Sequence, residues 1–139
     1  DGNIRVWEVE TGNELMAFKG HHYIIHSIAF SPDGNRFCSA GDGTVKVWNL
    51  KSGELEATFS GDGQIVDQAV FSPDGEKIIF VEIDGIIRIC DLELQKVVFN
   101  LVGHATPVNC IAISPNGRKI VSGDLDGKIY LWDWPVELQ

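Results

Sequence analysis

The residue types of a hydrolytic triad occur together near the start of this sequence, as His21, Ser39 and Asp42. In such a triad the histidine takes the proton of the attacking serine, and the carboxylate orients the histidine. An attacking serine also needs exposure, an oxyanion hole and usually a strained turn such as G-x-S-x-G. Ser39 lies in CSAG, inside an expected strand, and shows none of these signs. We therefore interpret the three residues as structural and keep a hydrolase that uses them as an alternative hypothesis.

Three closely spaced histidines, His21, His22 and His26, raise the question of a metal site. Residues four apart on a strand are separated by about 13 Å, and adjacent residues point to opposite faces, so these side chains do not converge on a zinc ion. Asp124 and Asp126 resemble part of a calcium loop, but the bidentate glutamate downstream is missing. We expect neither a metal ion nor a cofactor.

Two short motifs recur along the whole chain with one period. Asp-Gly pairs begin at residues 1, 42, 84 and 126, so their spacings are 41, 42 and 42. Turns of the type S-P-[DN]-G begin at residues 31, 72 and 114, with spacings of 41 and 42. Because two independent markers agree on the period, the sequence indicates a repeat architecture.

Composition and charge narrow the classes of protein and partner. The 139 residues are 44% hydrophobic and 22% charged, which is typical of one globular domain or part of one. The net charge of −9 repels nucleic acids and acidic membrane surfaces, so we expect neither as a partner. The sequence contains no apolar run of 18 residues, as a membrane-spanning helix would need.

Cysteine usage bears on the compartment. Cys38, Cys90 and Cys110 are odd in number, lack C-x-x-C spacing and lie inside apolar runs. This pattern indicates unpaired cysteines that serve as small buried side chains in a reducing compartment. We therefore expect an intracellular, cytoplasmic protein.

The turn-forming motifs within each repeat predict β-strands joined by tight turns. Ser-Pro-Asp-Gly and Asp-Gly supply the proline and the left-handed residues that hairpin turns require. The runs between them, such as HSIAF, RFCSA, TVKVW and LEATF, are short and rich in β-branched and aromatic residues. We predict four strands per period and no helix.

A period near 42, Gly-His before a strand, S-P-D-G, Asp-Gly and a closing Trp-Asp together resemble the WD-repeat family of β-propellers. The resemblance covers essentially the whole chain. It implies an all-β propeller segment of about 3.3 repeats, in which each blade is a four-stranded antiparallel sheet. By this resemblance, strands a to d run from the central channel outward, and Gly-His lies in the loop between strand d and the next strand a.

The repeat boundaries divide the chain into four expected blades. Residues 1–19 would supply strands c and d of a partial blade, 20–60 and 61–102 two full blades, and 103–139 strands a to c of a last one. Propellers usually hold about 4–8 blades, so one chain alone does not close a ring. We expect further blades of a parent chain, or self-association, to close it.

The resemblance also implies a structural tetrad in each blade. The residues that match it are His21, Ser39, Asp42 and Trp48 in the first full blade and His104, Ser122, Asp126 and Trp132 in the last. The middle blade has Asp62, Phe80 and Cys90 in place of histidine, serine and tryptophan, and only Asp84 remains. We expect this blade to depend on apolar packing instead of a polar network.

In WD-repeat proteins the loops after Gly-His line a face where partners dock, so the resemblance implies a protein or peptide partner there. Our candidate contact residues vary in chemistry from copy to copy: Tyr23, Ile24, His26, Gln64, Asp67, Thr106 and Asn109. We expect a non-catalytic scaffold for protein–protein interaction, part of a larger propeller or multidomain protein. The alternative in another class is a regulatory sensor module of a larger multidomain protein.

Overall fold

A serine–proline turn joins the first two strands in three of the four sheets, and its side chains explain its shape. Ser31 Oγ accepts the N–H of Arg36 at 2.9 Å and donates to Asp33 Oδ1 at 2.6 Å. Gly34, with φ of 74°, takes the left-handed conformation that closes the turn. The same hairpin recurs at the other two Ser-Pro sequences. Each one joins the first two strands of a sheet.

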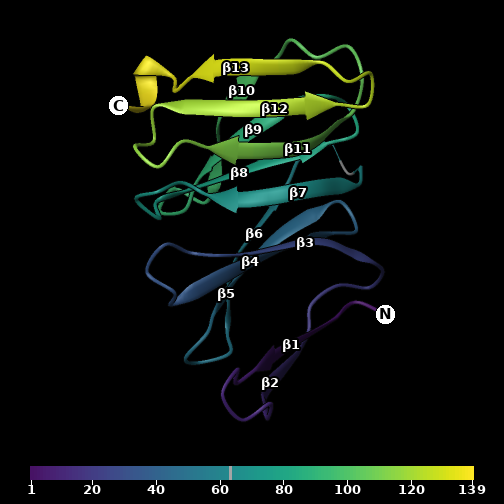
Figure 1. Ribbon diagram of the computed structural model, residues 1–139, viewed down its shortest axis with the longest axis vertical. Helices are drawn as coiled ribbons and strands as arrows, with labels where there is room; N and C mark the ends of the chain where they lie inside the picture. The colour runs from purple at the N-terminus through teal and green to yellow at the C-terminus, as the bar shows by residue number, and fades with distance from the viewer. Residues whose placement is uncertain (63) are drawn as a thin grey trace.

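The computed structural model describes residues 1–62 and 64–139, and in them thirteen strands form four antiparallel sheets (Figure 1). The first sheet contains β1 (Asn3–Trp7) and β2 (Glu14–Lys19). The second contains β3 (Ile25–Phe30), β4 (Arg36–Gly41), β5 (Thr44–Asn49) and β6 (Leu55–Ser60). The third contains β7 (Val66–Phe71), β8 (Lys77–Glu82), β9 (Ile87–Asp91) and β10 (Lys96–Leu101). The last contains β11 (Val108–Ile113), β12 (Lys119–Asp124) and β13 (Ile129–Asp133), followed by the short 3-10 turn Val136–Leu138.

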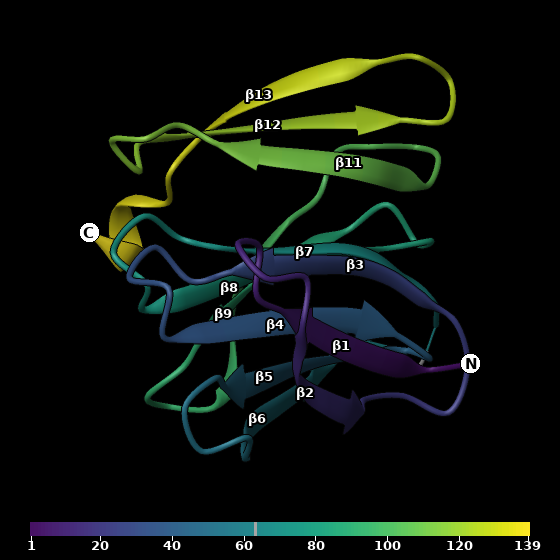
Figure 2. The ribbon, with the colours of Figure 1, turned by 60° about the horizontal axis from the view of Figure 1, so that its bottom comes forward.

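The sheets pack face to face in sequence order, and their apolar side chains form the core between them (Figures 1 and 2). Strand β8 in the middle shows how alternation divides its residues. Ile78 and Phe80 join the core on the side of the second sheet, whereas Ile79 and Val81 join the core on the side of the last sheet. All four side chains are fully buried. The third sheet, which we call the middle sheet because it lies between the second and the last, is therefore buried on both faces.

The innermost strands β3, β7 and β11 lie side by side (Figure 2), and side chains link them. Ser27 Oγ accepts the N–H of Ala69 on the neighbouring strand at 3.4 Å. Gln68 Oε1 accepts the N–H of Ile111 at 2.6 Å. These links fix the spacing of the strands from which the candidate contact residues project.

Two faces of the stack, on β13 of the last sheet and on β3 of the second sheet, carry apolar side chains in contact with solvent. Ile129 and Leu131 on β13 are exposed, as are Ile28 and Phe30 on β3. None of the four sheets closes on another, so the expectation that one chain does not complete a ring is confirmed. Among residues 1–62 and 64–139, no helix has the length and hydrophobicity that a membrane span requires.

Candidate functional site

His21, Ser39 and Asp42 come together in the second sheet with the connectivity of a triad. The Nδ1–H of His21 donates to Asp42 Oδ1 at 2.7 Å, and Ser39 Oγ–H donates to His21 Nε2 at 2.7 Å. Trp48 Nε1–H in turn donates to Ser39 Oγ at 3.0 Å. Every polar group of the set has a partner, so the set can hold the loop before β3 on strands β4 and β5.

Burial separates this set from a hydrolytic site. The Ser39 side chain is 0% exposed, and the indole of Trp48 already contacts its oxygen. A substrate carbonyl has no path to this hydroxyl, and an attacking serine needs one. The structure therefore gives no support to the alternative hydrolase hypothesis, although the distances resemble those of a triad.

Asp42 is the electrostatic centre of this network. Burial by itself would raise the pKa of Asp42, but hydrogen bonds from His21, from the His22 N–H and from the Thr44 hydroxyl outweigh it and lower the pKa to about 2. The carboxylate is thus ionised at neutral pH and fixes the loop through two of its neighbours, a side chain and a backbone N–H.

The last sheet contains an equivalent network, with one correction to its expected members. His104 Nδ1–H donates to Asp124 Oδ2 at 2.8 Å, while Ser122 Oγ contacts His104 Nε2 at 2.7 Å. Trp132 Nε1–H donates to Ser122 Oγ at 2.7 Å. The carboxylate partner of His104 is Asp124, so the prediction of Asp126 for this place was wrong.

The length of the turn after the strand explains the correction, because two residues join β4 to β5 but four join β12 to β13. Asp126 follows Ser122 by four positions, whereas Asp42 follows Ser39 by three, so the two Asp-Gly motifs do not lie at equivalent positions of their sheets. Asp124 is the last residue of β12 and is buried beside His104. Hydrogen bonds, first from His104 and then from two backbone N–H groups of the turn, lower the pKa of Asp124. Asp126 is left exposed in the turn.

The middle sheet replaces the histidine network with a group of charges. Arg88 on β9 contacts Asp84 at 2.6 Å, Asp62 at 3.0 Å and Glu82 at 3.2 Å. Phe80 and Cys90 are fully buried in the apolar core, as expected of packing residues. The prediction that packing alone replaces the polar network was nevertheless wrong, because an ion-pair cluster lies where the histidine would be.

Glu82 is the buried member of this cluster and binds the loop directly. Its side chain is 0% exposed, and its two oxygens accept the N–H groups of Gly61 at 3.1 Å and Asp62 at 3.2 Å. Burial raises the pKa of Glu82, against the opposing effects of these N–H groups and of Arg88. Glu82 follows Phe80 by two residues, as Asp124 follows Ser122, so both carboxylates end their strands at the same place.

Sequence reasoning missed Glu82, Arg88 and Asp124, although a signal for one of them was present. Arg88 lies two residues before Cys90 on an expected strand, and residues two apart share a face. Since Cys90 stands where a buried tryptophan was expected, Arg88 had to be buried and to need an acidic partner. The partner itself depended on the pairing of β8 with β9.

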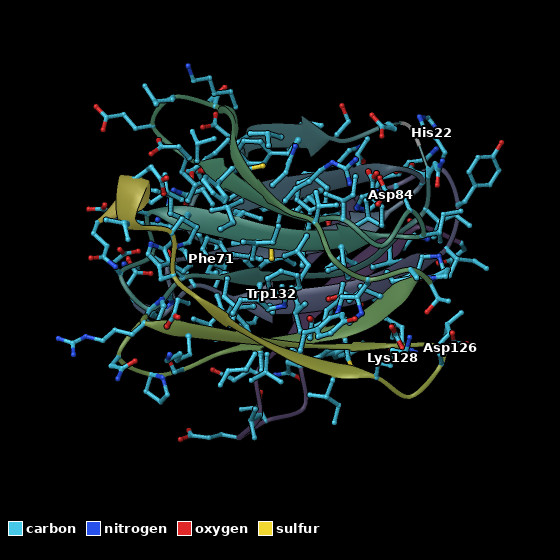
Figure 3. The ribbon with its side chains drawn as sticks, turned by 90° about the horizontal axis from the view of Figure 1, so that it is seen from above. His22, Phe71, Asp84, Asp126, Lys128 and Trp132 are labelled. Carbon is cyan, nitrogen blue, oxygen red and sulfur yellow. The ribbon has the colours of Figure 1, made fainter. Side chains whose placement is uncertain are left out.

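Two of the Asp-Gly turns press against the loops that precede the inner strands of the next sheet. A Cβ on Gly85 would lie 2.9 Å from the Thr106 carbonyl oxygen, and one on Gly2 would lie 1.9 Å from the His21 carbonyl oxygen. Both glycines have positive φ, so neither space nor backbone conformation admits a larger residue. The loops and turns thus form one continuous surface, which we call the loop face. Figure 3 shows His22, Asp84, Asp126 and Lys128 together at this end, away from the C-terminal turn.

The candidate contact residues all lie at or beside the loop face. Tyr23 is 74% exposed, and Ile24 beside it is also exposed. Gln64 is exposed in the loop before β7, and Thr106 is half-buried in the loop before β11. Within the described residues, Thr106 Oγ1 is a buried oxygen without a hydrogen-bond partner.

The other three candidates, His26, Asp67 and Asn109, occupy the same position on β3, β7 and β11. At each of them the pairing with the neighbouring strand shifts by a residue, which marks a β-bulge. A bulge redirects a side chain and is frequent next to functional sites. The three residues line one open hollow of about 450 Å³, which we call the bulge hollow. The sequence marked these residues as variable, but only the pairing registers show that they share a bulge.

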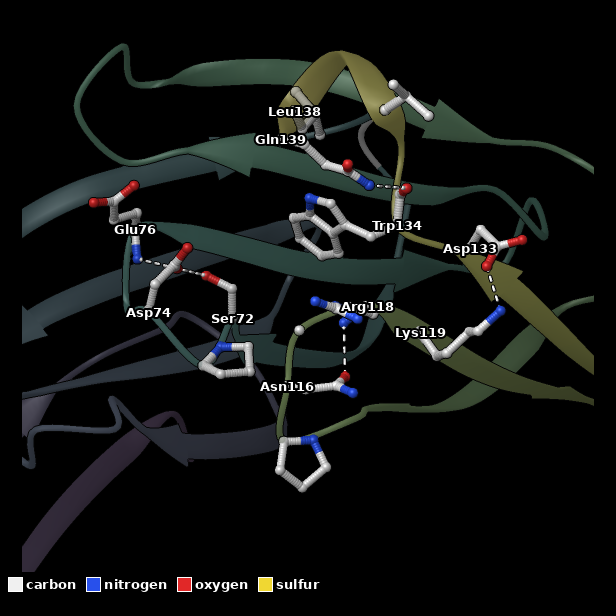
Figure 4. Close-up of a pocket in the computed structure, with 14 residues that line it drawn as sticks. Ser72, Asp74, Glu76, Asn116, Arg118, Lys119, Asp133, Trp134, Leu138 and Gln139 are labelled. Atoms are coloured by element: carbon white, nitrogen blue, oxygen red, sulfur yellow. Dashed lines mark hydrogen bonds and ion pairs between the residues drawn. The ribbon is translucent and has the colours of Figure 1, made fainter.

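A second and larger hollow, of about 1130 Å³, lies at the opposite end, between the Ser-Pro turns of the third and last sheets (Figure 4). Pro73 and Pro115 line its sides, and Trp134 contributes its buried ring. Lys119 and Asp133 form an ion pair on its wall. The lining carries both signs of charge, so it favours no one class of ligand, and the sequence did not predict it.

Among residues 1–62 and 64–139, no group of three or more histidine, cysteine, aspartate or glutamate side chains is arranged to hold a metal ion. His22 and His26 are both exposed. Cys38, Cys90 and Cys110 are free thiols, but Cys110 is exposed, so the expectation that all three are buried was wrong for it. Burial raises the pKa of Cys38 and of Cys90 to about 12. These two thiols are therefore un-ionised and unreactive near neutral pH.

Comparison with known proteins agrees with this geometry. The model of the WD domain, G-beta repeat, matches residues 12–49 and 95–133. Autophagy-related protein 16 of Arabidopsis thaliana is 39% identical over 41 residues, and human WD repeat and SOCS box-containing protein 1 is 40% identical over 42 residues. Each alignment covers 30% of this chain but only 8% and 10% of those two proteins, about one repeat. With the family model matching more than half of its residues, this chain belongs to the WD-repeat family.

Proposed function

We propose that this chain is a non-catalytic protein-interaction module whose partner docks on the loop face. WD-repeat domains in general mediate protein–protein interactions. The observation that carries the proposal is the bulge hollow, because three sheets repeat the same bulge and each places a different polar side chain there. Recognition sites are commonly variable residues on a rigid scaffold, and the buried networks behind the loops supply that rigidity.

Hydrophobic surface supports the further proposal that the stack is a segment of a larger propeller. The exposed faces of β3 and β13 carry apolar side chains that another sheet would cover. We propose that residues 1–19, 20–60, 61–102 and 103–139 are four successive blades, and that further blades or a second copy complete the ring. Three free thiols support an intracellular, reducing compartment.

Capture experiments on variants test the docking face. The chain is immobilised, and proteins captured from a cell extract are compared for Tyr23→Ala, Asn109→Ala and Glu54→Ala. Tyr23 and Asn109 lie at the loop face, whereas Glu54 is exposed in the turn before β6. Loss of an aromatic anchor typically costs about 2 kcal/mol or more at an interface, so Tyr23→Ala should reduce the capture of specific partners strongly.

The melting temperature of each variant serves as the control for folding. Because Tyr23 is largely exposed, its truncation should leave the melting temperature nearly unchanged. Should Glu54→Ala abolish capture while both loop-face variants retain it, the loop face is not the docking site.

A further inference from the structure

The bulge hollow is lined mainly by polar side chains from three strands. His26 and Ser27 come from β3, Asp67 and Gln68 from β7, and Asn109 from β11. Ser27 Oγ and Gln68 Oε1 are already engaged with backbone groups of the neighbouring strands. The hydrogen-bonding groups that face the hollow are therefore chiefly those of the three bulge residues.

Asp67 differs from the carboxylates that fix the loops at this end of the molecule. Asp42, Asp84 and Asp124 are each hydrogen-bonded to a histidine or an arginine. Asp67 is half-buried, and among the described residues its carboxylate has no ion pair and no hydrogen-bond donor. A carboxylate removed from part of its water favours a positively charged partner.

The surroundings of Asp67 add to its negative field. The cluster in the same sheet contains three carboxylates, Glu82, Asp84 and Asp62, against the single guanidinium of Arg88. The ammonium group of Lys46, on β5 of the second sheet, donates to the carbonyl oxygen of Gly20 at 2.8 Å and does not pair with Asp67. The whole chain carries a net charge of −9. This field attracts cations and repels anionic groups.

We infer that the bulge hollow binds an arginine side chain of the partner protein, with Asp67 as the charged acceptor. The inference rests on the proposed function and adds the chemistry of the partner. Asn109 supplies an amide oxygen from the neighbouring strand, so two acceptors from adjacent sheets face one planar donor group. A guanidinium offers five N–H donors in a rigid fork, whereas a lysine ammonium is a point charge that fits this pair of acceptors less well.

Titration of the ¹⁵N-labelled chain with short peptides tests the inference. The probes are N-acetyl-Ala-Arg-Ala-amide and the same peptide with lysine, citrulline or glutamate in the middle. Citrulline keeps the shape of arginine but carries no charge. We expect the arginine peptide to shift the amide signals of His26, Asp67 and Asn109 with a millimolar dissociation constant, and the citrulline and glutamate peptides to bind about tenfold more weakly or not at all.

Two variants with the same change of net charge distinguish binding at a specific site from attraction by the overall negative charge of the chain. Asp67→Asn removes the acceptor charge in the hollow, and Glu54→Gln removes one charge from an exposed position outside it. We expect Asp67→Asn to weaken binding of the arginine peptide about tenfold and Glu54→Gln to leave it nearly unchanged. Both variants should keep the wild-type melting temperature.

Several outcomes would overturn the inference: no binding of the arginine peptide, equal binding of the arginine and glutamate peptides, or equal weakening by Asp67→Asn and Glu54→Gln. The capture experiment above separates this failure from a failure of the proposed function. If capture depends on Tyr23 while the arginine peptide fails to bind, the loop face is the docking site and only the assigned chemistry is wrong.

Discussion

The last sheet and the middle sheet each hold the loop before their first strand, but by different interactions: hydrogen bonds of a histidine in the last sheet and an ion-pair cluster in the middle sheet. In the last sheet His104 connects Asp124 and Ser122 through hydrogen bonds, with the carboxylate as the only group that must carry a charge. In the middle sheet Arg88 and Glu82 are both buried ions, and Glu82 binds the loop backbone. A satisfied hydrogen-bond network and a buried ion cluster both fix a loop, but they respond differently to loss of one member.

That difference has a physical origin. Each buried ion costs several kcal/mol of lost hydration, which its partners must offset. Removing the cation of the cluster leaves two buried or half-buried carboxylates, Glu82 and Asp84, that keep backbone N–H donors but no longer have an opposite charge between them. Removing the histidine leaves one carboxylate that still accepts two backbone N–H groups, from Asp126 and Lys128. The middle sheet should therefore be the more sensitive of the two.

Arg88→Leu should give the largest loss of stability. We expect the free energy of unfolding to fall by about 3–5 kcal/mol, since the variant leaves the buried carboxyl group of Glu82 without its cation. Urea denaturation followed by circular dichroism measures the change. The matched control is Lys46→Leu at the equivalent position of β5, where one hydrogen bond to Gly20 is lost and about 0.5–1.5 kcal/mol is expected. Similar losses in both variants would contradict the buried-cluster account.

His104→Ala should have an intermediate effect. It removes one hydrogen-bond partner each from Ser122 and Asp124, and we expect a loss of about 1–3 kcal/mol. The β-sheet spectrum at low temperature should not change. A drop in the melting temperature as large as that of Arg88→Leu would remove the distinction between the two sheets.

Acid should weaken the second sheet through Asp42. Its pKa is about 2 in the folded protein against an ordinary value of 3.8, so its ionised form is favoured by folding. The resulting contribution, of about 2 kcal/mol, is fully present well above pH 4 and is lost as the pH falls from about 4 to about 2. Urea titrations across this range measure it, with Asp42→Asn as the control. If the variant shows the same slope as the wild type over this interval, Asp42 is not its source.

Substitution of the two aspartates near His104 tests the corrected assignment. Asp124→Asn should destabilise the last sheet more than Asp126→Asn, because only the first carboxylate contacts the histidine. Thermal melts of the two variants, measured side by side, give the ranking. The reverse ranking would restore Asp126 as the partner of His104.

Asp62→Ala should have the smallest effect. The side chain of Asp62 is 69% exposed, and exposed ion pairs typically contribute about 0.2–1 kcal/mol. Its contact with Arg88 should weaken further in high salt. Urea denaturation at low and high salt measures both quantities. A loss comparable to that of Arg88→Leu would show that Asp62, rather than Glu82, is the main anion of the cluster.

Local patterns in the sequence were sufficient to predict several features of the fold. The period near 42, the Ser-Pro turns and the alternating apolar runs identified an all-β stack of repeats without closure. The resemblance to WD repeats, supported by the hydrogen-bonding capacities of histidine, serine and tryptophan, led to the two networks, apart from one carboxylate. These features depend on residues close in sequence or on the chemistry of each side chain, and neither requires knowledge of the pairing register.

What only the tertiary structure decided depends on how the strands pair and pack. Glu82 and Arg88 meet across the β8–β9 hairpin, and Asp124 takes the place expected for Asp126 because the turn after β12 is longer than the turn after β4. Likewise, His26, Asp67 and Asn109 are 41 and 42 residues apart, and three bulges on adjacent strands bring them to one hollow. A shift of one residue in a strand moves each side chain to the other face of the sheet. For that reason the sequence by itself determined the repeat and its strands, whereas the packed sheets determined which charges of residues 1–62 and 64–139 meet in ion pairs.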